Sequence, residues 1–179
     1  MTIQPIVKFP DPRLRTVAEP VTVFDADLRA LAADLLETMR AASGIGITAP
    51  HIGVSKRVVV LQLSDDSEAR TYVNPTVVWA SPDLVRSPEG SISMNGVTAE
   101  VERPAQIRVR YQDLDGAEQI EEADGLLSVC HQHEIDQLDG IFWIQKLSPL
   151  KRDRAIKRYQ KLQRFGGASP ATKDATSDR

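Results

Sequence analysis

The chain has 179 residues, of which 41% are hydrophobic and 26% charged, and its formal net charge is −3; this composition suits one soluble domain with a sizeable core. It excludes a membrane-spanning protein, because no apolar run approaches the roughly 20 residues that a spanning helix needs. A disulfide framework and a cysteine zinc cluster are also excluded, because Cys130 is the only cysteine.

The charges are unevenly distributed along the chain. Residues 1–145 contain 12 Lys or Arg against 22 Asp or Glu, whereas residues 146–179 contain 10 against 3. We therefore expect an acidic body followed by a basic C-terminal segment. The start of the chain, MTIQPIVKFPDPRLR, contains neither an apolar signal core nor a small-residue cleavage site. The expected location is therefore the cytoplasm.

The first quarter of the chain predicts an extended segment, a helix and a loop. Residues 1–24 contain four prolines and no clear period, which predicts an extended segment on the surface. From Asp25, the stretch DADLRALAADLLETMRAASG has leucine and methionine at helical spacing, with Asp25 as N-cap and Gly44 as the stop. The glycine-bearing residues 44–53, GIGITAPHIG, are expected to form a loop.

The middle of the chain has the composition and alternation of β-strands. Residues 57–63 are rich in β-branched side chains. Residues 71–80 include Pro75, which predicts a bend or a position at a sheet edge. Two alternating stretches and a candidate returning strand follow: TAEVERP, QIRVRYQ and AEQIEEA.

Two further helices are expected toward the C-terminus. One runs from about Asp124, its N-cap, to Leu138, and Gly140 closes it. The other covers residues 148–165, with Ser148 as N-cap and proline in the first turn. A helix, then several strands, then helices indicates an α+β fold.

The end of the chain, residues 166–179, reads GGASPATKDATSDR. Because small and polar residues cannot bury a core, this composition predicts a disordered tail. The predicted organisation is therefore a single domain over residues 1–165 followed by that tail.

Residues 131–140, HQHEIDQLDG, place candidate catalytic groups on one helix. His133 and Gln137 share a face because they are four residues apart, and Glu134 reaches the same site from the side. A histidine at position 137 would complete His-Glu-x-x-His, in which two imidazoles hold a metal and the glutamate moves protons for a metal-bound water. On spacing alone, a satisfied or surface role for His133 is favoured.

Two upstream stretches reverse that preference. GIGITAPHIG (residues 44–53), PEGSISM (88–94) and HEIDQ (133–137) occur in this order. They resemble the signature motifs of the peptide deformylase family, Gly-x-Gly-Leu-Ala-Ala-Pro-Gln, Glu-Gly-Cys-Leu-Ser and His-Glu-x-Asp-His. The stretches FPDPRLR, YVNP and VERPAQIRVRYQDLDG agree as well, so that the resemblance covers roughly residues 5–147.

The resemblance implies an α+β fold in which antiparallel sheets surround a central helix that carries the His-Glu motif; here a C-terminal helix follows. Members of the family remove the N-formyl group from nascent peptides that begin with formyl-methionine. They hold one divalent ion, usually iron(II) but also zinc or nickel, with one cysteine and two histidines. Their glutamate, here Glu134, is the general base and acid, and a glutamine and a backbone N–H bind the formyl oxygen.

Three chemical positions of the family are altered in this sequence. The metal-ligand positions hold Ser91 in place of cysteine, His133, and Gln137 in place of the second histidine. His51 stands where the family has its oxyanion-binding glutamine, and His131 stands where the family has an apolar residue. The resemblance also places the bound substrate against four residues: Gly46, Ile92, Val129 and Cys130.

The two ligand substitutions argue against metal binding. Ser91 offers a neutral hydroxyl in place of a thiolate, and Gln137 offers a weakly donating amide oxygen. Catalytic zinc sites use three protein ligands drawn from His, Cys, Asp and Glu. Disturbing even the groups behind the ligands costs roughly 10–100-fold in affinity or activity. We therefore predict that the metal is absent or weakly bound, and that deformylation is lost or strongly reduced.

Two alternatives would preserve hydrolysis of formyl-peptides or related amides. A rebuilt metal site would combine His51 and His133, with a carboxylate from Glu134 or Asp136. The competing interpretation has His51 hydrogen-bonded to Ser91 or Glu134 in an empty pocket. A metal-free site would use Ser91, a histidine and Glu134 as nucleophile, base and acid.

The predicted C-terminal helix is strongly basic, with Asp153 as its single acidic residue. Its positive residues are Lys151, Arg152, Arg154, Lys157, Arg158, Lys161 and Arg164. An apolar stripe of Ile156, Tyr159 and Leu162 would dock the helix on the body. Clustered cations suit phosphate contacts, although a solvated face is the simpler interpretation.

Some members of the resembled family reach the ribosome through a C-terminal helix. A third hypothesis is therefore a nonenzymatic ribosome- or peptide-binding protein. Its expected partners are a nascent formyl-peptide and the ribosome, the latter through the basic helix. Neither a membrane nor DNA is expected as a partner.

Overall fold

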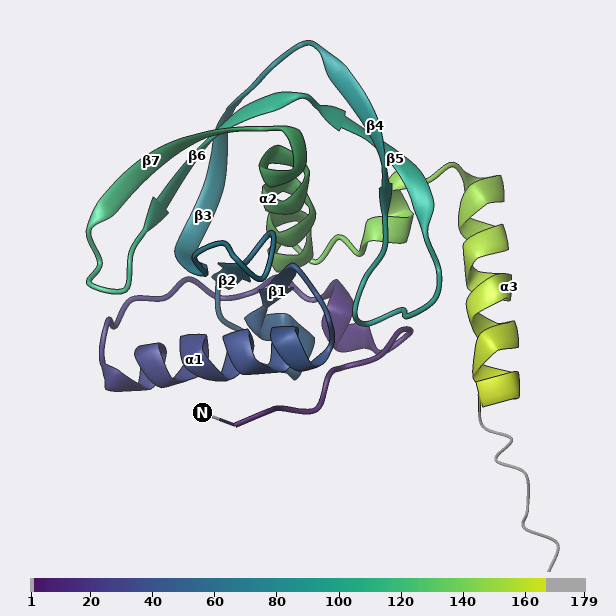
Figure 1. Ribbon diagram of the computed structural model, residues 1–179, viewed down its shortest axis with the longest axis horizontal. Helices are drawn as coiled ribbons and strands as arrows, with labels where there is room; N and C mark the ends of the chain where they lie inside the picture. The colour runs from purple at the N-terminus through teal and green to yellow at the C-terminus, as the bar shows by residue number, and fades with distance from the viewer. Residues whose placement is uncertain (1, 167–179) are drawn as a thin grey trace, which may run out of the picture.

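The computed structural model describes residues 2–166, which form three α-helices and seven β-strands (Figure 1). The helices are α1 (Ala26–Ala41), α2 (Gly125–Leu138) and α3 (Pro149–Gly166). Short 3-10 turns lie at Pro12–Arg15 (η1), Ala49–Ile52 (η2) and Trp143–Lys146 (η3). No helix in this part of the chain is both long enough and apolar enough to cross a membrane.

The strands form two antiparallel sheets. The larger has the order β1-β2-β3-β6-β7 and consists of Gly46–Thr48, Val58–Leu61, Arg70–Ala80, Gln106–Gln112 and Glu118–Asp124. The smaller pairs β4 (Leu84–Glu89) with β5 (Ala99–Pro104). Figure 1 shows α2 at the centre, with strands of both sheets around it and α3 at the outer side of the molecule. The predicted α+β fold with a central helix and an added C-terminal helix is confirmed.

The central position of α2 explains its unusual composition. Nine of its fourteen residues are buried, and polar side chains are among them: Ser128, His131, Gln132, Glu134 and Gln137. The helix contacts both sheets and η3, so most of its faces are covered by protein. Because a buried polar group must find a partner or leave a free energy deficit, the partners of these side chains decide what the helix can do.

The predicted helix ends are confirmed at Asp25 and Ser148, whereas Asp124 precedes α2 without a capping hydrogen bond from its side chain. The Asp25 carboxylate accepts a hydrogen bond from the Leu28 N–H at 3.0 Å, which caps α1. That helix ends at Ala41, before the predicted Gly44, because Ser43 has a left-handed φ of +53°. The Ser148 hydroxyl caps α3 by accepting from the Lys151 N–H.

Two expectations for the first half of the chain are corrected, and one strand is added. The segment predicted as a loop at residues 44–53 contains β1 and η2, and the strand β4 was not anticipated. Pro75 lies in β3, which is an interior strand, so the edge alternative is wrong. The predicted bend is present, because the register with β6 shifts between Val73 and Thr76.

The N-terminal segment is less superficial than its proline content suggested. It runs without a strand of its own along the body, as Figure 1 shows. It nevertheless contributes four buried side chains to the core: Val7, Leu14, Ala18 and Val21. At the other end, the predicted disordered tail lies, beyond Gly166, outside the described residues.

Helix α3 is anchored to the body rather than free. Ala155 and Tyr159 are buried in one cluster with Phe142 and Trp143, and the Tyr159 ring meets Phe9 edge-on with ring centroids 6.0 Å apart. The predicted apolar stripe is thus confirmed at Tyr159, whereas Leu162 remains 41% exposed.

Candidate functional site

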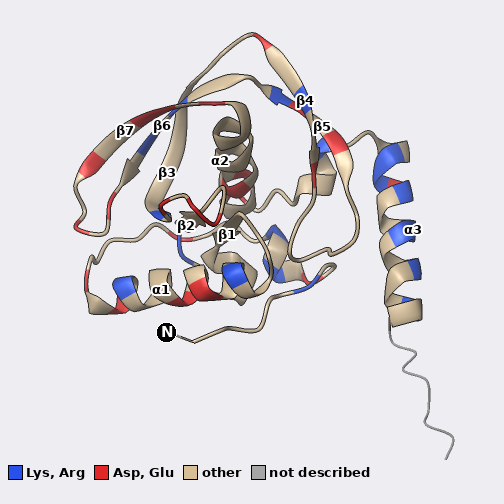
Figure 2. Ribbon diagram, viewed as in Figure 1, with Lys and Arg blue, Asp and Glu red and all other residues tan. Residues whose placement is uncertain are grey.

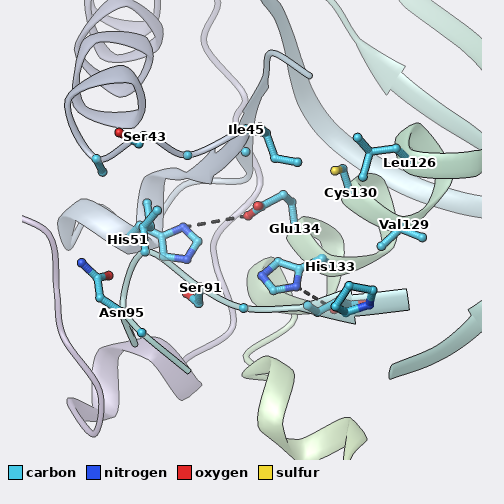
Figure 3. A pocket seen from close by; sticks show the side chains of 18 residues that line it. Ser43, Ile45, His51, Ser91, Asn95, Leu126, Val129, Cys130, His133 and Glu134 are labelled. Carbon is cyan, nitrogen blue, oxygen red and sulfur yellow. Dashed lines mark hydrogen bonds and ion pairs between the residues drawn. The ribbon is translucent and has the colours of Figure 1, made fainter. Parts of the chain in front are cut away.

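One cavity of about 480 Å³ lies against the central helix, between α2, β1 and the segment after β4 (Figure 3). Each of these elements contributes side chains to its wall. From the segment at residues 42–51 come Gly46 and His51, and from the segment at residues 88–96 come Ser91 and Ile92. The remaining wall belongs to α2: Leu126, Val129, Cys130, His133 and Glu134.

Part of the cavity wall is apolar. The four residues that the resemblance placed against a substrate, Gly46, Ile92, Val129 and Cys130, all line the cavity, and Leu126 extends the apolar wall. Burial, and then the nearby Glu134, raises the pKa of the Cys130 thiol to about 12. The sole cysteine is therefore a neutral wall residue and a poor nucleophile at neutral pH.

Another part of the wall rests on a network of paired charges. Glu89, at the end of β4, accepts two hydrogen bonds from the Arg103 guanidinium at 2.5 and 2.9 Å. Arg103 also donates to Asp136 at 2.8 Å, and Glu89 Oε2 lies 2.9 Å from His133 Nδ1. Burial alone would raise the pKa of Glu89, but the hydrogen bonds from His133 and Arg103 lower it to about 2. Glu89 is thus an ionised carboxylate that fixes the His133 ring.

His133 projects its second ring nitrogen toward the cavity. Its Nδ1–H donates to the Glu89 carboxylate, which leaves Nε2 on the cavity side. Burial alone would lower the pKa of His133, but the hydrogen bond to Glu89 and the negative charge of Glu134 outweigh burial and raise it. This carboxylate–histidine arrangement is the one that orients a metal-binding imidazole, so the support behind the single retained ligand is intact.

His51 is held by the chain turn that contains it. The Thr48 backbone N–H donates to His51 Nδ1 at 3.0 Å, and the Thr48 hydroxyl lies 2.8 Å from the same nitrogen. A backbone amide is always a donor, so Nδ1 must be the acceptor and the proton of the neutral ring lies on Nε2. Burial, followed by the positive potential of His133 and Lys8, lowers the pKa of His51 to about 3. The ring is therefore neutral at pH 7, with one N–H directed away from Thr48.

Glu134 is a second buried group whose polar atoms are incompletely paired. Its Oε2 has no hydrogen-bond partner within the described structure and lies 3.9 Å from His51 Nδ1. Burial raises the pKa of Glu134 to about 7, although His133 opposes that rise. The carboxyl group is packed so closely against Gly46 that a Cβ atom at position 46 would lie 2.5 Å from Oε1. A side chain at position 46 would therefore have to displace the Glu134 carboxyl group.

The two substituted ligand positions are occupied by side chains with other partners. The Ser91 hydroxyl oxygen accepts a hydrogen bond from the Ser93 N–H at 3.1 Å. The Gln137 side chain is 2% exposed and donates to the Leu14 carbonyl at 2.7 Å, which ties α2 to η1. Gln137 does not line the cavity as the described residues form it. The donor set therefore does not fit a catalytic metal held by three side chains.

The rebuilt metal site is not supported by the geometry either. A ligand nitrogen must present a lone pair to the metal, but the Thr48 amide fixes the proton of His51 on Nε2. Within residues 2–166, no group of three or more His, Cys, Asp or Glu side chains is placed to hold a metal ion. Asp136, the alternative carboxylate, is bound to Arg103 and Lys146 instead.

The hydrogen bonds predicted for His51 in an empty pocket are also not formed. The ring of His51 bonds to Thr48 rather than to Ser91 or Glu134, although it faces both. His131 lies on another side of α2, where its Nε2 is 2.9 Å from Glu121 and its ring meets Tyr72 edge-on. His131 is therefore not part of the cavity.

Sequence reasoning overlooked two residues that position the site. Arg103 pairs with Glu89 and Asp136, and Thr48 sets the protonation of His51. A buried arginine in an alternating strand, VERP, was the available signal for the first, since Arg103 falls on the same face of β5 as Val101. The three-residue spacing of a capping box, from Thr48 to His51, was the signal for the second.

Comparisons with known proteins point to one family. A profile of the family described as polypeptide deformylase matches residues 3–153. A Brucella suis protein named peptide deformylase-like is 69% identical over 164 residues, which cover 92% of this chain and all of the relative. A Brucella suis protein named peptide deformylase is 44% identical over 165 residues, covering 90% and 94%. The crystal structure of a peptide deformylase from Legionella pneumophila superposes with a TM-score of 0.89 at 37% identity, covering 94% of this chain and all of that one.

Proposed function

The chain belongs to the polypeptide deformylase family, and we propose that its cavity binds the amino-terminal end of a peptide while metal-dependent deformylation is lost or strongly reduced. In this proposal the apolar wall residues Ile92, Leu126 and Val129 receive the first side chain of the peptide. The polar wall residues His51, His133 and Glu134 face the terminal group of the peptide. Sites of this kind are mostly apolar, with a few convergent polar groups that fix orientation.

The observation that supports this proposal most directly is the use made of Gln137. Its amide donates to the Leu14 carbonyl and is buried between α2 and η1, so the side chain serves the fold at a position where the family has a metal ligand. The cavity beside it retains every residue expected to contact a substrate. A cavity that keeps its substrate-contacting residues but lacks two metal ligands favours peptide binding over hydrolysis.

The relatives lend independent support. Brucella suis contains both a protein named peptide deformylase-like, 69% identical to this chain, and a protein named peptide deformylase, 44% identical. Two such proteins in one organism are consistent with separate roles. We propose that this chain has the same role as the Brucella suis protein named peptide deformylase-like.

The experiment combines metal analysis with peptide turnover and binding. Protein purified anaerobically without added metal should contain well under one equivalent of iron, zinc or nickel. It should release no formate from a formyl-methionyl tripeptide, yet bind methionyl peptides in calorimetry. Near-stoichiometric metal that disappears in the His133→Ala variant would contradict the proposal, and so would the absence of peptide binding.

A pair of substitutions tests whether the missing ligands are responsible. Ser91→Cys together with Gln137→His supplies a cysteine and a second histidine beside His133. Metal uptake should return in the double variant and in neither single variant, since three ligands are needed for a catalytic site. If the double variant takes up no metal, the two substitutions are not what prevents binding.

One observation favours a second candidate, a metal-free hydrolase. Glu134 lies beside His133 with a pKa raised to about 7, which is the range expected of a general base that works near neutrality. Formate release from a formyl-peptide after exhaustive chelation, lost in the Glu134→Gln variant, would establish this candidate. Release at the rate of the protein-free blank would eliminate it.

We also propose that α3 contacts ribosomal RNA. Figure 2 shows Lys and Arg along the whole length of the helix at the outer side of the molecule. Arg152 has another role, because it donates to the carbonyls of Ile144, Gln145 and Leu147. Six exposed cations remain for phosphate contacts: Lys151, Arg154, Lys157, Arg158, Lys161 and Arg164.

Charge removal tests this contact better than deletion of the helix, because Ala155 and Tyr159 belong to the core. The triple variant Arg154→Ala, Lys157→Ala, Lys161→Ala should weaken cosedimentation with ribosomes and flatten its dependence on salt. The matched control replaces three exposed cations elsewhere, Arg15, Lys56 and Arg110, and changes the net charge equally. Equal losses in both triple variants would show that only net charge matters.

A further inference from the structure

A second hollow lies where helix α3 runs beside strand β5, at the outer side of the molecule (Figure 2). This α3–β5 groove has a volume of about 340 Å³ and shares no lining residue with the cavity against α2. Val97 and Ala155 line it and are buried, so they form its floor. Its size falls within the range of about 300–1,000 Å³ that small-ligand sites occupy.

The wall that α3 contributes to the groove is positively charged. Lys151, Arg154 and Arg158 are three and four residues apart, so they lie on one face of the helix, and all three line the groove and are exposed. None of them forms an ion pair with a side chain of residues 2–166. Like charges at this spacing repel one another along a helix, so an anion bound between them would relieve the repulsion.

The β5 side of the groove adds one hydroxyl and one carboxylate. Thr98 is exposed there and offers an O–H donor. Glu100 carries the single negative charge among the lining residues that the structure describes. Three cations against one carboxylate leave the groove with a net positive charge, which favours an anionic ligand.

We propose that the α3–β5 groove is a binding site for a phosphate group. The phosphate oxygens accept from the Lys151 ammonium, from the Arg154 and Arg158 guanidinium groups and from the Thr98 hydroxyl. Arginine suits this role because its planar fork of N–H donors matches the geometry of a phosphate. The phosphate belongs either to a small phosphate ester or to an RNA backbone, and the inference rests on the proposed RNA contact of α3 only for the second source.

The first experiment uses inorganic phosphate, titrated at constant ionic strength while amide ¹⁵N–¹H spectra are recorded. Saturable shifts should appear at Thr98 and in the first turns of α3. The double variant Lys151→Gln, Arg154→Gln should bind phosphate about 10-fold more weakly, as the loss of charged donors predicts. The matched control, Lys157→Gln with Arg164→Gln, also removes one lysine and one arginine, but from outside the groove. It should change the affinity by less than about twofold, because solvent and salt screen distant exposed charges.

Substitution of Glu100 tests the location of the site with the opposite sign. The Glu100→Gln variant removes the carboxylate that repels a phosphate and should bind it severalfold more tightly. Glu102 pairs with Arg86 and does not line the groove, so Glu102→Gln should leave the affinity nearly unchanged. Equal weakening in the two double variants, or the absence of saturable shifts at the groove, would overturn the inference.

A short oligouridylate, titrated in the same way, identifies the source of the phosphate. If the source is RNA, the oligonucleotide should bind more tightly than inorganic phosphate, and the Lys151→Gln, Arg154→Gln variant should flatten its dependence on salt. Binding no tighter than that of inorganic phosphate would support a small phosphate ester and contradict the proposed RNA contact of α3, while the groove itself would stand. Ribosome binding without any phosphate shift at the groove would do the reverse.

Discussion

Two groups of buried polar side chains on either side of His133 behave in opposite ways. In the network behind the histidine, Arg103 donates to Glu89 and to the partly buried Asp136 at 2.5–2.9 Å. In the cavity in front of it, His51 and Glu134 each retain a buried polar atom without a partner in the part of the chain that the structure describes. The same helix, α2, contributes to both groups.

This contrast separates the parts of the site that serve the fold from those that await a ligand. A buried charge network is tolerated only when nearly every member is paired, and the network behind His133 meets that condition. His51 and Glu134 in the cavity do not meet it. Their missing hydrogen bonds must be supplied by a bound molecule, or the folded state loses stability. Substitutions in the two groups should therefore differ in size, in sign and in pH dependence.

The largest effect is expected at Arg103, which is 4% exposed. The Arg103→Met substitution keeps the length of the apolar stem but leaves Glu89 and Asp136 without their guanidinium partner. Removing one member of a buried charge group costs about 3–5 kcal/mol. Urea unfolding at pH 7 should show a loss of this size in the free energy of unfolding.

The neighbouring strand offers a matched control for that experiment. Arg86 in β4 pairs with Glu102 in β5 at 2.8 Å, but both side chains are substantially exposed. The Arg86→Met substitution should cost less than about 1 kcal/mol, because solvent screens such pairs. Similar losses for Arg86→Met and Arg103→Met would show that burial does not distinguish the network.

The second prediction concerns Glu134, where substitution should stabilise. Its pKa is about 7 in the folded protein against 4.5 for an ordinary glutamate. Between these values the folded state retains a proton that the unfolded state has released. The stability contributed by the proton is therefore present below about pH 4.5 and is lost as the pH rises through about 7.

The Glu134→Gln variant does not titrate at this position, so its advantage over the unmodified protein should grow from pH 5 to pH 8. The growth should reach up to about 3 kcal/mol, the equivalent of the pKa shift. Unfolding free energies at both pH values provide the measurement. Because the other titrating groups are common to both proteins, a difference that stays constant with pH would contradict the shift at Glu134.

The sequence predicted which residue types and elements meet at the cavity, but it did not predict which of their polar groups are paired. The helical spacing of His133 and Gln137, together with the motif frames, identified the elements that meet at the cavity. The direction of each hydrogen bond depends on distant segments: Gln137 bonds to a carbonyl 123 positions earlier in the chain. No local pattern encodes such a pairing, so the structural use of Gln137 was not foreseeable.

The fold was predictable to a similar degree. Caps such as Asp25 and Ser148 act through hydrogen bonds within a few residues, and these were identified from sequence. Strand β1 has only three residues, and its place at the edge of the sheet depends on pairing with β2. Short elements that exist because of their neighbours carry too little periodic signal to be recognised.

The third prediction tests whether Gln137, like the network behind His133, is a paired buried group that serves the fold. The Gln137→Met substitution preserves the shape of the side chain and removes the donor to the Leu14 carbonyl. Leaving a buried carbonyl without this donor should cost about 2 kcal/mol. Gln160, an exposed glutamine on α3, provides the control, since Gln160→Met should change stability by less than about 0.5 kcal/mol. Equal stability of the Gln137→Met variant and the unmodified protein would show that this hydrogen bond does not support the fold.

The smallest effect is expected at Thr48. This residue pairs His51 Nδ1, so that the proton of the neutral ring lies on the unpaired Nε2. The Thr48→Val substitution removes the hydroxyl that lies 2.8 Å from His51 Nδ1 and keeps the backbone N–H at 3.0 Å. Valine has nearly the same shape and suits a strand, so the cost should be about 1 kcal/mol, that of one ordinary hydrogen bond. The protonation of His51 should not change, because the amide alone requires a lone pair at Nδ1. Imidazole ¹⁵N spectra of the variant check this point: a proton that moves to Nδ1 would show that the hydroxyl, and not the backbone, sets the direction in which His51 donates.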